Sequence, residues 1–215
     1  MTINGFVFDF DGLILDTELP RYHAWQNKFS QFGYALSFGD WKKIIGTDHN
    51  DYDPVEDLFN RTKGKIDRIE VNNWIEQYTN EHLLHQSLLP GVESFIHQAY
   101  QRGFKLAVAS SSSFEWVWPF LERFGIASLF DTVLTNRDVK FVKPDPALYL
   151  LAVQKLALAP NSVVAFEDSL NGVKSAKTAG LYCVAIPNQL TRSMDLHLAD
   201  IIVDSFNQLS IDEFS

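Results

Sequence analysis

The stretch Phe6-Val7-Phe8-Asp9-Phe10-Asp11-Gly12 decides how the rest of the chain is interpreted. Its apolar run is too short for a helix and is typical of a buried parallel strand. Side chains two residues apart on an extended chain lie on one side, so Asp9 and Asp11 can point together beyond the strand's carboxyl end, where open α/β sheets bind ligands. Two carboxylates this close repel each other unless a cation lies between them or one keeps its proton. Because Asp-Gly also ends strands in plain tight turns, the heptad alone leaves turn and function as alternatives.

Four serines follow a second strand-like run that ends at Ala109. Ser112 or Ser113 is expected to cap the next helix. Ser110 is nearest the strand end, so its hydroxyl and the neighbouring backbone N–H groups, including that of Ser111, are placed to hold a phosphoryl oxygen.

A lysine stands in the segment Val142-Lys143-Pro144-Asp145-Pro146. Asp145 and Pro146 have a structural explanation as N-cap and first residue of the following helix. Lys143 has no such role, and a lysine fixed outside a helix start is suited to clamp the charge that develops on a phosphoryl group.

Two adjacent acids, Glu167 and Asp168, end a third strand-like run ahead of a helix predicted from about Gly172 to Ala179. Acids there can simply complement the helix macrodipole. Together with Asp9 and Asp11, however, they complete an oxygen-rich set of the kind that Mg²⁺ prefers.

In their order and spacing these four segments resemble the four motifs of the haloacid dehalogenase superfamily of phosphohydrolases. The text around Asp9–Glu18 and Phe166–Val173 is similar to the subgroup that contains β-phosphoglucomutase and its phosphatase relatives. The resemblance covers nearly the whole predicted core and is weak after Thr17.

The resemblance implies a Mg²⁺-dependent phosphohydrolase that acts on a small phosphorylated metabolite, such as a sugar phosphate monoester. Asp9 would be the nucleophile that forms an aspartyl-phosphate, and Asp11 the general acid and base. The implied Mg²⁺ ligands are Asp9, the backbone carbonyl of Asp11, Glu167 and Asp168, and the implied phosphate-binding residues are Ser110, Ser111 and Lys143. A β-phosphoglucomutase-type mutase and a receiver-like phosphoacceptor remain as alternatives.

The 215-residue chain is predicted to be an α/β protein with a doubly wound parallel-sheet, Rossmann-like core formed by residues 1–17 and 86–215. Between them, residues 18–85 have helical spacing and predict an inserted helical cap. The strands expected in the core after the first are 104–109, 131–135, 162–167, 181–186 and about 201–203. The expected helices are 91–102, 113–124, with a kink or late start at Pro119, 145–157, 171–179 and a terminal helix.

The predicted cap supplies candidate substrate contacts. Counted from Asp9, the position of the mutase's cap histidine falls on Arg21, and His23 lies two residues on. Asp48 and His49 lie in an acidic loop, where solvated loop residues are the alternative explanation. An acidic cap entrance disfavours bisphosphates and suits a monophosphate with a hydroxyl-bearing leaving group.

Composition restricts the partners. Eighteen basic and 27 acidic residues give a net charge of −9 with no basic run, which argues against nucleic-acid and anionic-membrane partners. The single Cys183 excludes an internal disulfide. No apolar leader or membrane-length stretch is present, so we expect a soluble cytoplasmic protein, a monomer or weak dimer, whose partner is a small phosphate ester.

Overall fold

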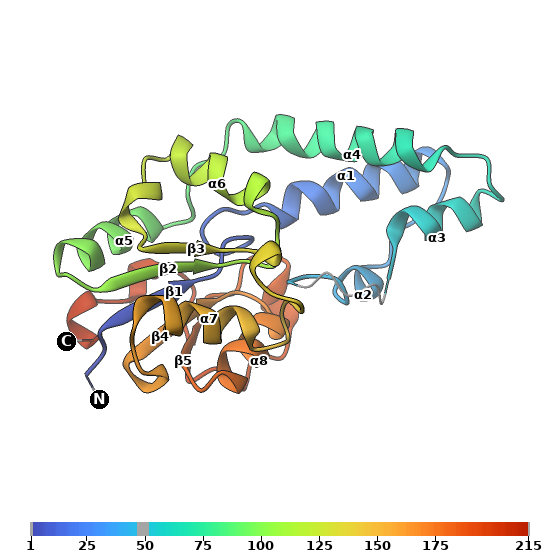
Figure 1. Ribbon diagram of the computed structural model, residues 1–215. Coiled ribbons are helices and arrows are strands. Elements are labelled where there is room, and N and C mark those ends of the chain that lie inside the picture. The colour runs from blue at the N-terminus through green and yellow to red at the C-terminus, as the bar shows by residue number, and fades with distance from the viewer. Residues whose placement is uncertain (1, 47–51, 215) are drawn as a thin grey trace.

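The computed structural model describes residues 2–46 and 52–214, and its centre is a six-stranded parallel sheet (Figure 1). The strand order is β3-β2-β1-β4-β5-β6. The strands are β1 (Gly5–Phe8), β2 (Lys105–Ala109), β3 (Thr132–Leu134), β4 (Val163–Glu167), β5 (Tyr182–Ala185) and β6 (Ile201–Ile202). The chain builds outward from β1 to β3 and then on the other side from β4 to β6, so the order reverses between β1 and β4. This confirms the predicted doubly wound fold and places its ligand-binding switch point beside β1.

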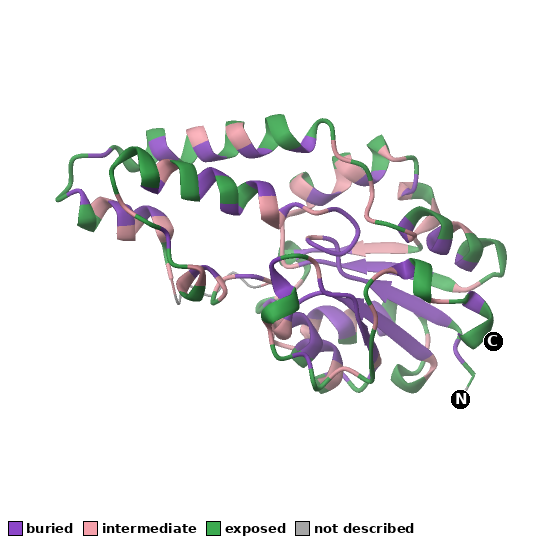
Figure 2. Ribbon diagram, turned by 180° about the vertical axis from the view of Figure 1, so that it is seen from behind, coloured by how far each residue is buried: buried purple, intermediate pink, exposed green. Residues whose placement is uncertain are grey.

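Successive side chains of each strand point alternately into two apolar cores, one on each face of the sheet. Phe6 and Phe8 of β1 point into the first core and Val7 into the second. Helices α5 (Val92–Gln101) and α6 (Phe114–Arg123) pack on the first face, and α7 (Ala147–Leu156) and α8 (Leu170–Thr178) on the second. Figure 2 shows the central strands buried and the outer faces of the helices exposed. Burial of both faces is the reason that these strands read as nearly continuous apolar runs.

The observed boundaries of the core elements lie within two residues of the predicted ones, but two details differ. Helix α6 begins at Phe114 and contains Pro119, so the late start considered for this helix does not occur. The predicted terminal helix is wrong, because the chain after β6 forms two short 3-10 helices, Phe206–Gln208 and Ile211–Phe214. Three apolar residues of this segment enter the first core, and the first two are five residues apart, a spacing that does not keep one face of an α-helix. Further 3-10 helices are Ala127–Leu129, Asn136–Asp138, Pro160–Ser162 and Thr191–Ser193.

The segment between β1 and α5 is helical, as predicted. It contains α1 (Glu18–Gln31), α2 (Phe38–Trp41), α3 (Pro54–Arg61) and α4 (Arg68–Leu83), and α1 lies along α4 (Figure 1). These helices share a third apolar cluster that includes Trp25, Phe29, Trp41, Leu58 and Ile75. Apart from Leu190 and Met194, the described members of this cluster lie within residues 19–78, which fits a cap with its own core. The exact limits 18–85 stay a prediction. Among the described helices none combines the length and the apolar character needed to cross a membrane.

Candidate active site

Three buried acids meet at the switch point between β1 and β4. Phe8 pairs with Phe166 in parallel register, so the residues that follow each strand lie together at the carboxyl end of the sheet. The backbone N–H of Asp9 donates to the carbonyl of Phe166 at 3.0 Å. One carboxylate oxygen from each of Asp9, Glu167 and Asp168 lies within 4.8 Å of the other two, and all three residues are buried. Strand register alone therefore brings together acids that are about 160 residues apart in the sequence.

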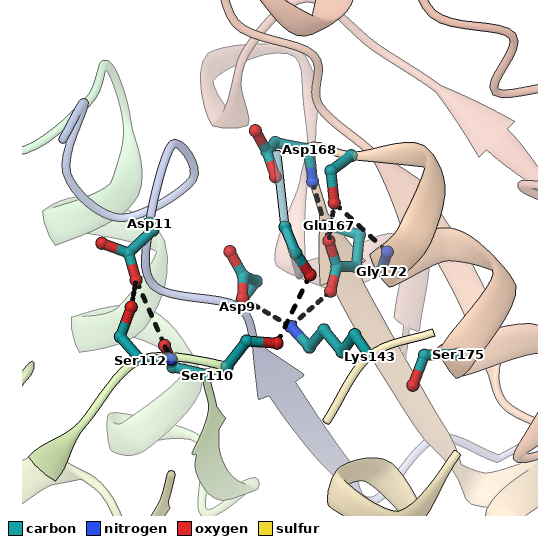
Figure 3. A network of polar contacts seen from close by, with 12 residues as sticks. Asp9, Asp11, Ser110, Ser112, Lys143, Glu167, Asp168, Gly172 and Ser175 are labelled. Atoms are coloured by element: carbon teal, nitrogen blue, oxygen red, sulfur yellow. Dashed lines mark hydrogen bonds and ion pairs between the residues drawn. The ribbon is translucent and has the colours of Figure 1, made fainter. Parts of the chain in front are cut away.

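Lys143 places a positive charge among these acids. Its side chain is 1% exposed, its Nζ forms an ion pair with Asp9, and it donates to Glu167 Oε1 at 2.6 Å (Figure 3). Burial alone would lower the pKa of Lys143, but the carboxylates of Asp9 and Glu167 outweigh burial and raise the pKa above its ordinary value. Lys143 is therefore a permanent positive charge beside Asp9.

When ionised, Asp9, Glu167 and Asp168 carry more negative charge than Lys143 can neutralise, and this excess favours the binding of a cation. Burial raises the pKa of Asp9 and of Asp168 well above the ordinary value, and repulsion from the neighbouring carboxylates adds to it. A divalent cation among the carboxylates would reverse these shifts and stabilise the ionised forms. Because the donors are all carboxylate oxygens, the residues present fit a hard cation such as Mg²⁺.

Two glycines leave the room that these acids occupy. Gly12 has φ of +81°, and a Cβ there would lie 2.5 Å from Asp168 Oδ2. In that space Asn188 Nδ2 donates to Asp168 Oδ2 at 2.7 Å and to the carbonyl of Gly12 at 3.1 Å. A Cβ on Gly172, in the first turn of α8, would lie 1.9 Å from Glu167 Cδ. Both glycines are therefore required by close approach to the acidic group.

Asp11 lies beside this group and is held by four donors. Thr17 Oγ1 and Trp116 Nε1 donate to its Oδ1 at 2.7 and 2.8 Å. Ser112 and Ser110 donate through Oγ to Oδ2 at 2.7 and 3.2 Å. Figure 3 shows Asp9 between the Asp11 carboxylate with its serines and Lys143. The predicted acid–base residue is thus next to the predicted nucleophile, with both of its oxygens accepting hydrogen bonds.

A cavity of about 360 Å³ opens between the acidic group and helices α1 to α4. Its floor includes Asp9 and Asp11, and its helical side contributes Arg21 and Glu18. Burial and the negative charge of Asp11 raise the pKa of Glu18 to about 7. The remaining lining residues are Trp25, Trp41, Ile44, Gly46, Tyr52, Asp53, Pro54, Val55, Asn72, Ser111 and Ser112. The cavity therefore joins the carboxylates of Asp9 and Asp11 to an aromatic and polar wall.

Of the remaining predicted site residues that the structure describes, some line the cavity and others do not. Ser111 lines the cavity, but its hydroxyl donates to the carbonyl of Gly46 at 3.3 Å. His23 is exposed on α1 and is not among the lining residues of that cavity. Asp48 and His49 lie outside the described residues, so their predicted roles stay predictions.

Several residues of the site gave no sufficient signal in the sequence. Ser113, not Ser112, caps α6, which leaves the Ser112 hydroxyl free to bind Asp11. Trp116 and Trp118 are two residues apart on a helix and cannot share a face, so one of them is expected to contact a neighbour or to remain exposed. The structure shows that Trp116 donates to Asp11. Nothing pointed to Tyr149, which is completely buried and donates to Glu167 Oε1 at 2.5 Å.

Comparison with known proteins assigns the family. The sequence profile described as haloacid dehalogenase-like hydrolase matches residues 6–186. The chain belongs to this family. The hydrolase is 36% identical to the candidate phosphatase YhcW of Bacillus subtilis (strain 168), over 97% of this chain and 94% of that protein.

Two further relatives have names that state a substrate or a ligand. The phosphorylated carbohydrates phosphatase of Thermotoga maritima is 28% identical to the hydrolase over 83% of this chain and 82% of that protein. A crystal structure of CbbY from Rhodobacter sphaeroides, in complex with xylulose 1,5-bisphosphate, superposes with a TM-score of 0.78 at 27% identity, covering 97% of each chain. The predicted family is confirmed, and the chain is an enzyme of a hydrolase family that includes phosphatases.

Proposed function

We propose that this hydrolase is a Mg²⁺-dependent phosphohydrolase of small phosphorylated metabolites, with sugar phosphate monoesters as its substrate class. The observation that carries the proposal is the buried group of Asp9, Lys143, Glu167 and Asp168 at the switch point. It combines a carboxylate nucleophile with the positive charge that a phosphoryl group requires. The names of YhcW and of the Thermotoga maritima phosphatase support the same reaction class.

The reaction needs two displacements at phosphorus. In the first, a carboxylate oxygen of Asp9 attacks phosphorus, the bond to the leaving oxygen breaks, and Asp11 gives that oxygen its proton. In the second, Asp11 takes a proton from a water that attacks the aspartyl-phosphate, and inorganic phosphate leaves Asp9. Lys143, Ser110 and the N–H of Ser111 are assigned to the phosphoryl oxygens. For this role the hydroxyl of Ser110 would turn from Asp11, to which it donates in this structure.

Asp9, Glu167, Asp168 and the backbone carbonyl of Asp11 are the groups we assign to hold Mg²⁺. When bound, the ion supplies positive charge against the phosphoryl oxygens. Asn188 and Gly12 support this assignment, because they fix Asp168 in its place.

The cavity favours a monophosphate over a bisphosphate. Arg21 is the single lysine or arginine among its described lining residues, and residues 47–51 contain neither type. Asp53 and Glu18 line the same wall. A mutase that holds a second phosphate needs more positive charge there, so phosphosugar mutation is the weaker alternative. Membership of a hydrolase family also disfavours a receiver-like phosphoacceptor.

The test is phosphate release from a panel of phosphorylated metabolites, including β-glucose 1-phosphate with and without a bisphosphate primer. We expect turnover with Mg²⁺ and none in excess chelator. Asp9→Asn should abolish turnover, because an amide neither attacks phosphorus nor carries a phosphoryl group. Asp204→Asn, which changes an exposed acid outside the buried group of Asp9, Glu167 and Asp168, is the control. Full turnover of the Asp9→Asn protein would assign the nucleophile elsewhere, and primer-dependent isomerisation would favour the mutase. Cytoplasmic location and a monomeric or weakly dimeric state stay predictions.

A further inference from the structure

Tyr149 is a buried hydroxyl donor at the back of the acidic group. It lies on α7, is completely buried, and its OH donates to Glu167 Oε1 at 2.5 Å. A phenol hydroxyl carries its proton at neutral pH, so Tyr149 is a hydrogen-bond donor to Glu167.

The donors around Glu167 are divided between its two oxygens. Oε1 accepts from Tyr149 and, at 2.6 Å, from Lys143 Nζ. Oε2 accepts only long contacts among the described residues, from the N–H of Asp168 at 3.2 Å and the hydroxyl of Ser169 at 3.5 Å. Two strong donors thus hold Oε1, while Oε2 is the oxygen with capacity for a further partner.

Lys143 by itself could not maintain this division. Its ammonium is shared between Asp9 and Glu167, and a lysine is a flexible point charge. The phenol is carried on a rigid ring that the packing of α7 against the sheet holds in place, and Lys143 Nζ lies 5.1 Å above that ring. Tyr149 is therefore the fixed contact, and Lys143 is the contact that can move toward a phosphoryl group.

We infer that Tyr149 is a positioning residue of the cation site: it holds Oε1 of Glu167 so that Oε2 faces the cation, and it leaves Lys143 free to serve Asp9. The inference rests on the proposed function, since it assumes that Asp9, Glu167 and Asp168 bind a divalent cation. Tyr149 touches neither the cation nor the substrate in this role. Partners of metal ligands that act in this way typically change metal affinity by about 10- to 100-fold.

The test measures cation binding to substrate-free protein. Mn²⁺ binding, followed by the paramagnetic resonance of the free ion, and Mg²⁺ binding, followed by calorimetry, should both be at least about 10-fold weaker in Tyr149→Phe than in the wild type. In steady-state assays the apparent Mg²⁺ requirement should rise by a similar factor, while substrate KM and kcat at saturating Mg²⁺ should stay within about twofold. Tyr149→Met, which removes the donor but fills much of its volume, replaces Phe if that variant does not fold.

Two comparisons separate positioning from loss of packing. Tyr34→Phe removes a tyrosine hydroxyl that donates to the carbonyl of Arg61 at 2.7 Å, and it should leave cation affinity unchanged. In a Glu167→Gln background, Tyr149→Phe should have no further effect on Mn²⁺ affinity, because the oxygen that it orients is no longer a carboxylate oxygen. Unchanged affinity in Tyr149→Phe, or additive losses in the double variant, would overturn the inference. A wild-type protein that binds neither ion would instead overturn the metal assignment of the proposed function.

Discussion

Asp11 accepts four hydrogen bonds, and this number limits what a substitution at position 11 can preserve. In Asp11→Asn the amide oxygen can keep Trp116 and Thr17, whose N–H and hydroxyl need an acceptor. The amide NH₂ then faces Ser110 and Ser112, whose hydroxyls can rotate and accept. The fold and the backbone carbonyl at position 11 should therefore survive while both proton transfers are lost.

For Asp11→Asn we expect a loss of about 10²–10⁴-fold in steady-state turnover of a sugar phosphate. An aryl phosphate needs little protonation of its leaving group, so its first step should be less affected, and the aspartyl-phosphate should accumulate. Rapid-mixing experiments would detect this as a burst of phenol release. Equal losses for both substrates without a burst would remove the acid–base role of Asp11.

Gly172 gives a second prediction at the residue scale. Its φ is not in the left-handed region, so alanine would ordinarily stabilise α8 by about 0.5–1 kcal/mol. A Cβ would instead lie 1.9 Å from Cδ and Oε2 of Glu167, which would have to leave its partners. We expect Gly172→Ala to cost about 1–3 kcal/mol of unfolding free energy and to weaken Mg²⁺ binding by at least about 10-fold. Gly39→Ala in α2, where a Cβ makes only an ordinary contact, is the matched control, and equal behaviour of the two variants would contradict the prediction.

At the scale of elements, α1 begins with Glu18, and burial makes the ionised form of this side chain unfavourable. The pKa of Glu18 is raised from 4.5 to about 7, so between these values the folded protein binds a proton that the unfolded chain has released. Stability contributed by this group therefore falls as the pH rises through this window. The helix macrodipole, which favours acids in the first turn, opposes the effect by only about 0.3–1 kcal/mol.

We expect Glu18→Gln to raise the unfolding free energy at pH 8 by on the order of 1–3 kcal/mol and to leave it unchanged below pH 4.5. Urea denaturation in the absence of divalent cations would measure both values. Glu93→Gln removes an exposed first-turn acid from α5 and serves as the control, with no gain at pH 8 expected. A pH-independent difference for Glu18→Gln would mean that its carboxyl is well solvated.

At the scale of the whole molecule, hydrogen bonds to residues that follow strands β2 and β4 help to hold the helical segment on the sheet. Asn171 Nδ2 donates to the carbonyl of Ile45 at 3.0 Å, and Ser111 donates to that of Gly46 at 3.3 Å. A Cβ on Gly46 would lie 2.4 Å from Ser169 Oγ, so this loop is pressed against the start of α8. The loop at Ile45 and Gly46 therefore contacts residues that follow β4, the same strand whose end carries Glu167 and Asp168.

Asn171→Ala should loosen this contact without changing the carboxylates to which we assign catalysis. A hydrogen bond of about 0.5–1.5 kcal/mol corresponds to a rise of roughly 2- to 10-fold in substrate KM. Amide exchange of the peptides around Ile45 should become faster. Asn27→Ala breaks a hydrogen bond to Tyr78 within the helical segment and should change neither quantity. Unchanged exchange near Ile45 in Asn171→Ala would show that other contacts hold the segment.

The sequence by itself determined the strands of the sheet and the polar residues that follow their carboxyl ends. Apolar runs that end in Asp9, Ser110 or Glu167 are local signals, and parallel pairing brings the ends of such strands together. For this reason the α/β fold, the family and the acidic group could be predicted before any contact was known. The helical nature of the inserted segment followed in the same way from its spacing.

Only the tertiary structure decided which side chains surround those residues. Trp116 meets Asp11 from 105 residues away, and Asn188 meets Asp168 from 20 residues away with α8 and β5 between them. Neither contact has a periodicity or a motif. Tyr149 reads as one more apolar residue of α7 until the packing of that helix turns its hydroxyl to Glu167. The cavity wall likewise depends on how the helical segment packs over the sheet. Periodicity reports whether a residue is buried, whereas the partner of a buried polar group is fixed by packing between distant elements.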